Sequence, residues 1–399
     1  METRYPTLVL KPGKEKPVQK GHPWIFSGAV ARREGIFEPG KTVAVRSADG
    51  MPLGVGFYNP GSDIVVRLFS RQIDTPIGPA FWRDRIRRAI RLRAGCVPAG
   101  TTAYRLINAE GDFLPGLVVD RYGDILAVAI GTLGMETIRS TVVDCLVEAI
   151  GATGVWERST GRARRREGLE ERTGLLRGSV PERIPVEENG CRFVVNVQKG
   201  QKTGFFLDQR PNREIVRTLS HGAVVLNGFA YTGGFSVYAA AGGAKRVVSV
   251  DSSSDAASLA VENLVLNGFS VDTHPVRTAD MFRFLRETAD VYDVVVLDPP
   301  SLAKSPSEVA RAARAYKDAN LHAMRRIRDG GLLMTFSCSN FISAELFAKV
   351  VQGAAVDAGK TAQVLSVLQP GPDHPTDLAH PEGRYLKGLL LRVGDVSAQ

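Results

Sequence analysis

The sequence predicts a mixed α/β protein whose carboxyl-terminal part is a doubly wound, mostly parallel sheet. The prediction rests on a change of pattern along the 399 residues. Short β segments separated by Gly and Pro fill residues 1–72, whereas strands alternate with helices from about residue 200 onward. Residues between these stretches carry both patterns. We therefore expect a small β-rich domain over 1–73, an α+β middle domain over 74–184 and the doubly wound domain, led by a β-hairpin, over 185–399.

The first domain combines short strands with positive charge. Segments such as TVAVRS and DIVVRLF are rich in branched apolar residues, as strands are. The stretch KGHPWIFSGAV (20–30) follows three lysines and begins with a fourth, Lys20, so it places Trp24 and Phe26 beside positive charge. Lys20 and Trp24 are therefore candidate contacts for a polyanion, although either ring could equally belong to the core.

The middle domain is predicted to begin with a basic amphipathic helix. In RDRIRRAIRLRAG (83–95), the apolar residues Ile86, Ile90 and Leu92 alternate with six arginines. This spacing predicts an apolar stripe that packs on the domain and a basic face on the other side.

A compact α+β layer is expected after this helix. The pattern predicts paired strands over 104–130, a helix near 135–150 and a further strand at 154–159. Residues 160–183 lack apolar periodicity and are rich in both charges, so we expect an exposed excursion there rather than core.

The charge of the chain is unevenly distributed. The net charge of +9 divides into +10 over residues 1–220 and −1 over the remainder. An excess confined to one part of the chain favours a polyanion such as nucleic acid as the partner. The sequence contains no run of eighteen apolar residues and no secretory pattern at its start. It therefore predicts a cytoplasmic protein with no membrane partner.

Cysteine and histidine spacing predicts neither a disulfide nor a metal site. The four cysteines, Cys96, Cys145, Cys191 and Cys338, lie 46 or more positions apart, and the six histidines show no metal-ligand spacing. Each cysteine is therefore expected to be a thiol. The first three fall in the middle domain and the hairpin, where a buried thiol acts as a small apolar side chain.

Successive strands of the doubly wound domain are expected to end in groups that can hold a ligand. The strand AVVLNGF leads into a loop in which Gly233 and Gly234 let the backbone approach a ligand closely. KRVVSVD ends at Asp251, a third strand ends near Asp280, and YDVVVLD ends at Asp298. Because the carboxyl ends of parallel strands face one crevice, Asp251 is placed to accept hydrogen bonds from ribose hydroxyls, and Asp280 is placed beside an adenine edge.

The spacing of the glycines narrows the choice of ligand. It does not match G-x-G-x-x-G, which argues against a nicotinamide or flavin site, and the chain has no G-x-x-x-x-G-K-[ST] motif for a nucleoside triphosphate. The adenosine ligand that still fits is S-adenosylmethionine. The glycine loop, the acidic second strand and DPPS after the fourth strand resemble class I S-adenosylmethionine-dependent methyltransferases, whose sheet is Rossmann-like.

A narrower resemblance covers nearly the whole chain. Its motifs are GQKTGFFLDQRPNRE (200–214), NGFAYTGGFSVYA (227–239), VVVLDPPSLAKS (294–305), AYKDANLHAM (315–324), TFSCSN (335–340) and HPEGRYLKG (380–388). In this order they resemble the large-subunit ribosomal RNA methyltransferase I family, which makes 5-methylcytosine in 23S rRNA. KGHPWIFSGAV resembles the PUA domain of that family, a small RNA-binding β-barrel. The resemblance implies S-adenosylmethionine as cofactor and large-subunit ribosomal RNA as partner.

The resemblance also implies cofactor contacts, residue by residue. They lie in the LDQR segment, in the loop after the first strand and at the acidic strand ends: Asp208, Gln209, Arg210, Phe229, Tyr231, Thr232, Gly233, Gly234, Asp251, Ser252, Asp280, Met281, Asp298 and Pro299. Gly228 departs from the pattern, because relatives are expected to carry a bulkier residue there.

Methylation at C5 of a pyrimidine needs a nucleophile, because C5 itself reacts poorly. A thiolate that adds to C6 turns C5 into an enamine-like carbon. Cys338 follows the fifth strand and Asp298 the fourth, so neighbouring strands should bring both to one crevice. Asp298 would also hydrogen-bond the N3/N4 edge of cytosine. Other 5-methylcytosine enzymes place a cysteine in the loop after the fourth strand, where this chain has Ser301, so Cys338 is the expected nucleophile. A helix that begins near Ser343 would favour its thiolate.

The target base must be unpaired or flipped out, because a stacked base hides C5 and C6. The basic first half of the chain would then hold phosphates while the crevice reads one base. Pro300, Lys304, Tyr316 and Lys317 flank the crevice and are candidate RNA contacts. For Lys304, Tyr316 and Lys317, a position on a helix surface without a role in binding is the alternative.

Two other functions stay open at this point. An exocyclic-amine methyltransferase also uses a D/N-P-P-x loop, but it stacks an aromatic residue after the prolines, where this chain has Ser301. A PUA-type RNA-binding assembly factor would keep the fold without catalysis, and it would be favoured by a failure to bind S-adenosylmethionine. The sequence leaves open the target nucleotide, the base that removes the C5 proton, and whether the chain forms a homodimer.

Overall fold

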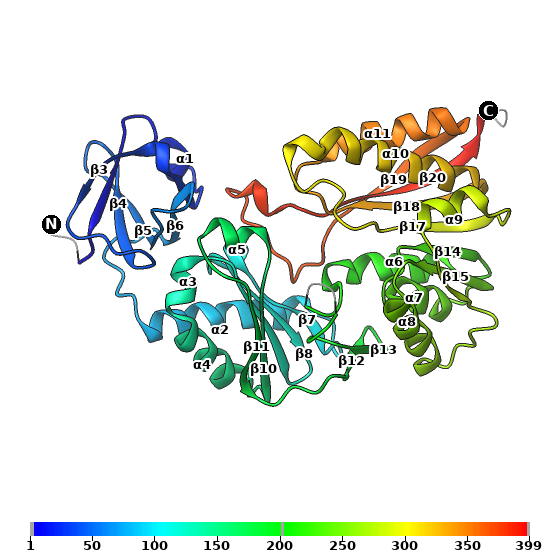
Figure 1. Ribbon diagram of the computed structural model, residues 1–399, viewed down its shortest axis with the longest axis horizontal. Coiled ribbons are helices and arrows are strands. Elements are labelled where there is room, and N and C mark those ends of the chain that lie inside the picture. Colours follow the sequence, from blue (N-terminus) through cyan, green and yellow to red (C-terminus); the bar gives the residue numbers. More distant parts are fainter. Residues whose placement is uncertain (1–3, 201–202, 397–399) are drawn as a thin grey trace. The chain divides into compact units, whose positions relative to one another are not determined.

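The computed structural model describes residues 4–200 and 203–396, so Gln201 and Lys202 of the GQKTGFF motif lie outside the described residues. The chain packs as two compact units, and Figure 1 shows their elements. Unit 1 holds the chain up to Val186 with residues 195–207 and 372–383, and unit 2 holds residues 187–194, residues 208–371 and the chain from Arg384. The expected boundary between residues 73 and 74 falls inside unit 1.

Unit 1 begins with a six-stranded sheet in the order β2-β6-β5-β4-β1-β3. Its strands are β1 (Thr7–Leu10), β2 (Trp24–Phe26), β3 (Val30–Glu34), β4 (Thr42–Arg46), β5 (Pro52–Tyr58) and β6 (Ile64–Ser70). Their branched apolar side chains form one buried cluster, joined by Val18 of the short helix α1 (Lys16–Gln19). Because β2 and β3 are the end strands, the sheet is a curled half-barrel rather than the closed barrel that the sequence suggested.

The second sheet of unit 1 has the order β11-β10-β9-β8-β7. Its strands are β7 (Ala103–Asn108), β8 (Leu117–Tyr122), β9 (Ile125–Ile130), β10 (Gly154–Ser159) and β11 (Arg172–Gly178), and its helices are α2 (Pro79–Cys96), α3 (Leu133–Thr137) and α4 (Arg139–Ile150). Trp82 and Ile86 of α2 share one core with Phe57 and Phe69 of the first sheet. The expected amphipathic helix, hairpin strands and following helix are therefore confirmed.

Two details of this unit differ from the sequence prediction, and both concern charged residues. Leu92 is 44% exposed, because α2 turns Arg93 inward instead, where Arg93 Nη2 donates to Asp112 Oδ2 at 2.7 Å. Residues 160–183 are mostly exposed, as expected, but they contain α5 (Arg162–Arg166) and β11, which pairs with β10, and Arg164 and Glu167 within them are buried. Glu167 is buried there because Arg67 neutralises its carboxylate at 3.0 Å. Charged residues enter a core when they are paired in this way.

A two-stranded hairpin, β12 (Ile184–Glu188) and β13 (Cys191–Val195), follows as predicted. Asn189 and Gly190 have φ of 48° and 77°. A two-residue hairpin turn needs left-handed backbone at both central positions, which Asn and Gly tolerate.

Unit 2 is built on a seven-stranded sheet in the order β16-β15-β14-β17-β18-β20-β19. The strands are β14 (Val224–Gly228), β15 (Arg246–Asp251), β16 (Val276–Thr278), β17 (Tyr292–Leu297), β18 (Ile327–Ser337), β19 (Lys360–Leu368) and β20 (Lys387–Asp395). The first five are parallel, and β20 runs antiparallel to β18 and β19. The order reverses between β14 and β17, so the carboxyl ends of these strands open one crevice, as in other doubly wound sheets.

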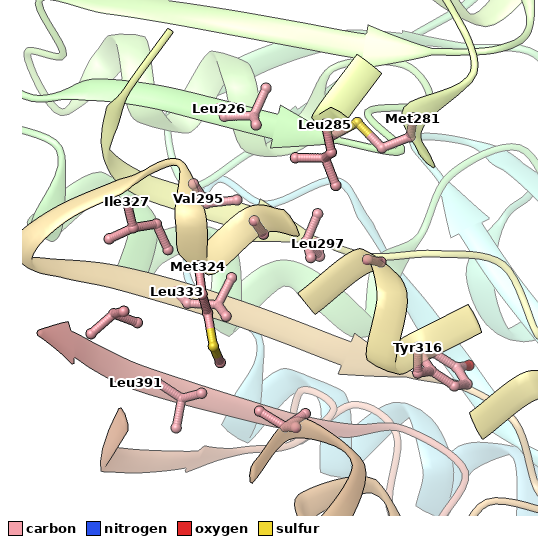
Figure 2. Packing of buried hydrophobic residues seen from close by; sticks show 14 of the residues in the cluster. Leu226, Met281, Leu285, Val295, Leu297, Tyr316, Met324, Ile327, Leu333 and Leu391 are labelled. Carbon is pink, nitrogen blue, oxygen red and sulfur yellow. The ribbon is translucent and has the colours of Figure 1, made fainter. Parts of the chain in front are cut away.

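Helices cover both faces of this sheet (Figure 1). They are α6 (Arg210–Leu219), α7 (Gly234–Ala241), α8 (Ser254–Leu266), α9 (Met281–Glu287), α10 (Val309–Arg325) and α11 (Ala344–Ala358). One apolar cluster joins β17 and β18 to α9, α10 and α11, and Figure 2 shows Leu297 and Leu333 within it. Tyr316 of α10 lies at the edge of this cluster beside the carboxyl end of β18 (Figure 2). The core therefore fixes the strand ends on which the predicted site stands.

Candidate active site

The loop between β14 and α7 has a strained backbone. Phe229, Tyr231 and Gly233 have φ of 58°, 47° and 78°, in the left-handed region that other residues than glycine rarely adopt. At Gly233 a Cβ would also lie 3.0 Å from Ala260 Cβ. Gly234 then opens α7, as the sequence predicts. Strained loops of this kind cluster at ligand-binding positions, which agrees with the cofactor loop expected here.

Asp251 ends β15 and holds the loop in place. Its Oδ2 accepts a hydrogen bond from the Tyr231 N–H at 2.8 Å, and its Oδ1 accepts one from the Ser253 N–H at 2.9 Å. Each carboxylate oxygen has a second lone pair, and the side chain is only half-buried. Asp251 can therefore still accept hydrogen bonds from ribose hydroxyls, and the exposed Ser252 lies next to it.

The third acidic strand end has a structural role as well. Asp280 is exposed and caps α9 by accepting a hydrogen bond from the Arg283 N–H at 2.8 Å. Met281 is 2% exposed and belongs to the core. A Cβ on Gly228 would lie 2.8 Å from Met281 Cε and 2.9 Å from its Sδ. Met281 thus fills the space left by the unusual glycine, and cofactor contacts of Asp280 and Met281 stay predictions.

The LDQR segment is buried throughout. Asp208, Gln209 and Arg210 are 3%, 1% and 2% exposed. Asp208 Oδ2 accepts a hydrogen bond from the Tyr385 hydroxyl at 2.5 Å, and Gln209 Oε1 accepts one from Asn212 Nδ2 at 2.6 Å. These contacts fix the segment within unit 2, and its cofactor contacts stay predictions.

Several buried polar atoms of unit 2 could be satisfied by a polar ligand. Asn227 Oδ1, Thr232 Oγ1, Gln209 Nε2 and Thr335 Oγ1 have no hydrogen-bond partner among the described residues. Asn227 lies in β14 just before the strained loop, Thr232 lies within the loop, and Thr335 lies near the end of β18. Buried polar groups are nearly always hydrogen-bonded in native proteins. Together with Asp251, these atoms fit a nucleoside-containing cofactor.

The structure brings Cys338 and the DPP loop together. β17 and β18 pair in parallel with Leu297 opposite Thr335, so Asp298 and Cys338 both follow the carboxyl ends of neighbouring strands. The Cys338 thiol lies 3.9 Å from the Pro299 carbonyl oxygen, to which it donates a weak hydrogen bond. Asp298 is half-buried, and its N–H donates to the Gly228 carbonyl at 3.5 Å. Pro300 is exposed next to them.

A network of hydroxyl groups supports the thiol from behind. The Tyr316 hydroxyl accepts a hydrogen bond from Ser337 Oγ at 3.0 Å and lies 3.2 Å from Ser339 Oγ. Ser339 Oγ in turn bonds Ser301 Oγ at 3.1 Å and accepts from the Ala303 N–H at 3.2 Å. Both serines that flank Cys338 are fully buried. They therefore tie the end of β18 to the DPP loop and cannot contact RNA directly.

Comparisons with known proteins agree with this geometry. Residues 8–71 match the model of a PUA-like domain, and residues 128–353 match that of the S-adenosylmethionine-dependent methyltransferases. The ribosomal RNA large subunit methyltransferase I of Shewanella amazonensis is 42% identical over 391 residues, which cover 97% of this chain and 99% of that protein. Its namesake from Aeromonas hydrophila is 41% identical over 393 residues, with the same coverage.

The chain belongs to the ribosomal RNA large subunit methyltransferase I family. It is therefore an S-adenosylmethionine-dependent methyltransferase, as the sequence predicts. A proposed methyltransferase from Streptococcus mutans has the same fold, with a TM-score of 0.82 at 23% identity over 97% of this chain and 99% of that one. A further structure of a proposed methyltransferase, complexed with SAH, has a TM-score of 0.83 at 24% identity and the same coverage.

The sequence did not predict that a lysine of this methyltransferase lies beside the thiol. Lys387 begins β20 opposite Ser337, and its Nζ donates to the Ser339 carbonyl at 2.7 Å. Burial lowers the pKa of Lys387, and the neighbouring Cys338 raises it in part. The HPEGRYLKG motif contains this lysine, but only the pairing of β20 with β18 shows that it lies beside the thiol.

One of the two RNA contacts predicted on α10 needs correction. Tyr316 is 1% exposed and serves the hydroxyl network, so it does not lie on the surface. Lys317 pairs with Asp357 at 2.7 Å, and both side chains stay partly exposed. The contact of Lys317 with RNA therefore stays a prediction. Lys304 is exposed beside the DPP loop and stays a candidate.

Of the two candidates in the first domain, Lys20 is exposed and Trp24 is half-buried. Trp24 Nε1 donates to Glu110 Oε1 at 2.9 Å, the Arg67 guanidinium lies over the ring, and the His380 ring packs against it at 4.4 Å. These contacts occupy both the face and the polar edge of the indole. Trp24 therefore has a structural role, and its direct contact with RNA stays a prediction.

Two further findings concern the part of the chain that the structure describes. In residues 4–200 and 203–396, no three His, Cys, Asp or Glu side chains are grouped to hold a metal ion. Over the same residues, none of the helices is both long enough and apolar enough to span a bilayer. All four cysteines carry thiols rather than disulfides, and Ser343 caps α11 as the sequence predicts.

Proposed function

We propose that this methyltransferase forms 5-methylcytosine in large-subunit ribosomal RNA through a covalent bond between Cys338 and the base. The contact between Cys338 Sγ and the Pro299 carbonyl carries the proposal, because it sets the only thiol of the described sheet crevice beside the DPP loop. The names of the relatives support ribosomal RNA as the substrate. The net charge of +10 over residues 1–220 supports a nucleic-acid partner as well.

The reaction uses the thiol twice. The electron pair of the Cys338 thiolate forms a bond to C6 of cytosine, and the electrons of the C5–C6 double bond move to C5. S-adenosylmethionine supplies the methyl group that C5 then binds. A base, for which water is sufficient, removes the C5 proton. The electrons of that C–H bond restore the double bond while the bond between sulfur and C6 breaks and returns its pair to sulfur.

Asp298 and its loop position the base for this attack. The Asp298 carboxyl group hydrogen-bonds the N3/N4 edge of cytosine, where charge develops as the thiolate adds. Pro299 is buried and Pro300 follows directly, so the loop has few conformations to lose on binding. The bonds from Ser339 to Ser301 and Ala303 hold the same loop against β18. The approach of sulfur to C6 is therefore set before the base arrives.

Lys387 supplies the positive charge that a reactive thiolate needs. Its ammonium group is half-buried and is fixed to the Ser339 carbonyl, one residue from the nucleophile. A cation next to a cysteine favours the thiolate over the thiol. Tyr316 also lies near the thiol, where burial raises the pKa of its hydroxyl so that it stays neutral, and Lys387 reaches the thiol as a cation from the neighbouring strand.

Mass-spectrometric mapping of ribosomal RNA from cells that lack the protein tests the proposal. We expect a missing 5-methylcytosine that returns with the wild-type gene and with Cys191→Ala, a matched buried cysteine, but not with Cys338→Ala. Calorimetry should show unchanged S-adenosylmethionine binding by Cys338→Ala. Full activity of Cys338→Ala, or a methylated exocyclic amine in place of 5-methylcytosine, would overturn the mechanism.

A transcript made with 5-fluorocytidine tests the covalent step directly. The fluorine atom cannot leave C5 as a proton does, so the adduct should persist after methyl transfer. We expect an adduct that survives denaturation, maps to Cys338 and requires S-adenosylmethionine. An adduct on another cysteine, or none with a transcript that the enzyme methylates, would contradict the role of Cys338.

A further inference from the structure

Unit 1 contains a cleft of about 500 Å³ between the end of the first sheet and helix α2. Arg71, Arg85 and Arg88 line it together with the rings of Phe81 and Phe113. We refer to these five residues as the arginine cleft. The cleft gathers two features that the methylation chemistry does not use, the arginine-rich helix and the aromatic residues near it.

Arg85 is fixed between two aromatic rings. Its guanidinium lies 5.2 Å from the centroid of Phe81 and 5.5 Å from that of Phe113, and Nη2 donates to the Phe69 carbonyl at 2.8 Å. Burial, and next the charge of Arg88, lower the pKa of Arg85. Positive charge is thus crowded in the cleft, and an anion placed there would relieve the repulsion.

Phe113 presents an exposed ring on a rigid support. Its side chain is 50% exposed, and its backbone has φ of 58° at the end of a helical turn. The preceding residue, Asp112, is buried and bound by Arg93 through two hydrogen bonds of 2.5 and 2.7 Å. A strained, half-exposed aromatic residue is costly to keep unless it contacts a ligand. An aromatic face next to a guanidinium is a platform on which a nucleic-acid base can stack.

Arg71 joins the cleft to the predicted RNA contact Lys20. Arg71 Nη1 donates to the Val18 carbonyl at 3.1 Å, and Nη2 also bonds the Gly21 carbonyl. The turn that carries the exposed Lys20 therefore lies beside this side of the cleft. Positive charge consequently continues from the cleft onto the surface in front of it.

Two aspartates offset only part of this charge. Asp84 pairs with Arg88 at 2.8 Å, but both side chains are more than half exposed, and such surface pairs are weak. Asp377 acts on Arg71 and also accepts a hydrogen bond from the Ala379 N–H at 3.0 Å. Three arginines thus face two carboxylates in the cleft itself, with Lys20 at its edge.

The other side of α2 shows that this arrangement is specific to one face. Arg83 and Arg87 lie within 3.1 and 3.7 Å of Glu148 on α4, which offsets part of the charge of that face. Of the arginines of this helix, Arg83 and Arg87 therefore face α4, whereas Arg85 and Arg88 line the cleft.

We propose that the arginine cleft binds an unpaired nucleotide of the RNA, with its base stacked on Phe113 and its phosphates held by Arg71 and Arg88. The inference rests on the proposed function, because it assumes that RNA is the substrate. It assigns to unit 1 a defined nucleotide site instead of a general attraction between charges.

Binding of labelled RNA measures this site without any methyl transfer. Fluorescence anisotropy with a single-stranded RNA of about 10 nucleotides should show roughly tenfold weaker binding for Phe113→Ala. Phe113→Trp, which keeps the stacking face, should bind like the wild type. Arg88→Ala should reduce the slope of log affinity against log salt by about 1, whereas Arg87→Ala on the opposite face should not change it.

Equal binding by Phe113→Ala, Phe113→Trp and wild type would overturn the stacking site. Equal salt slopes for Arg88→Ala and Arg87→Ala would overturn the phosphate contact. Both results leave the proposed function intact if the variants still produce 5-methylcytosine. If the wild type binds neither this RNA nor a ribosomal RNA transcript, the proposed function itself fails. Circular dichroism of Phe113→Ala keeps a folding defect separate from lost stacking.

Discussion

Substitution of Tyr316 by phenylalanine isolates the hydroxyl group that joins the end of β18 to its surroundings. This hydroxyl bonds Ser337 at 3.0 Å and Ser339 at 3.2 Å, and all three side chains are buried. Each such bond contributes about 0.5–1.5 kcal/mol net, so Tyr316→Phe should lower the free energy of unfolding by about 1–3 kcal/mol. The Cys338 position should also become less well defined, and a misplacement of this kind costs up to about 100-fold in rate.

Urea denaturation and steady-state methylation separate these two effects. We expect a lower urea midpoint, a lower kcat and an unchanged dissociation constant for S-adenosylmethionine. The matched control is Tyr292→Phe, which alters a fully buried tyrosine of the same cluster at the opposite end of β17. The hydroxyl network would have no role in positioning Cys338 if Tyr316→Phe kept the kcat of Tyr292→Phe.

The remaining predictions concern charge and titration. Lys387→Met should slow the alkylation of Cys338 by iodoacetamide at neutral pH by about tenfold, because an opposite charge at close range favours the thiolate by at least this factor. Mass spectrometry of the peptide that contains Cys338 measures the alkylation rate. Lys387→Arg should restore most of the rate, and Lys360→Met, which removes a lysine of the neighbouring strand, should leave it unchanged; equal rates in all three would refute the role of Lys387. Arg93→Met leaves the buried Asp112 carboxylate without its partner and should lower the free energy of unfolding, measured with urea, by about 3–5 kcal/mol. Asp112→Asn in the same chain should recover part of this loss. A loss below about 1 kcal/mol would contradict the pairing. Burial raises the pKa of Cys191 from 9.0 to about 11, so its neutral thiol stabilises the fold below pH 9 and this contribution disappears as the pH rises to about 11. The difference in unfolding free energy between wild type and Cys191→Ala should shrink over that range, and a constant difference would contradict the assignment.

The sequence predicts the positions of the strand ends well, because short-range patterns set them. A parallel strand buried on both faces is a short apolar run, and the residue that ends the run must lie at the carboxyl edge. Asp251, Asp298 and Cys338 follow from that rule alone. The turn at Asn189 and Gly190 follows from local backbone preference in the same way.

Long-range pairing explains what the sequence does not predict. Most of residues 160–183 are exposed as predicted, yet Glu167 is buried because it pairs with Arg67, which is one hundred positions away. Arg93 likewise points inward because it pairs with the buried Asp112. Lys387 reaches the thiol only through the antiparallel pairing of β20 with β18. No periodicity in a single segment contains these partners.

The position of the nucleophile follows from the loop that faces it. The hydroxyl of Ser301 bonds Ser339 Oγ and the Ala303 carbonyl at 3.1 and 3.2 Å, so this loop position is occupied in holding the DPP turn against β18. A reactive thiol in the same place would give up both bonds. Cys338 lies instead at a strand end whose neighbours on both sides are buried, and Lys387 reaches it from β20. In the proposed mechanism the task is thereby divided between two elements: the loop after β17 would hold the base, and the end of β18 carries the sulfur.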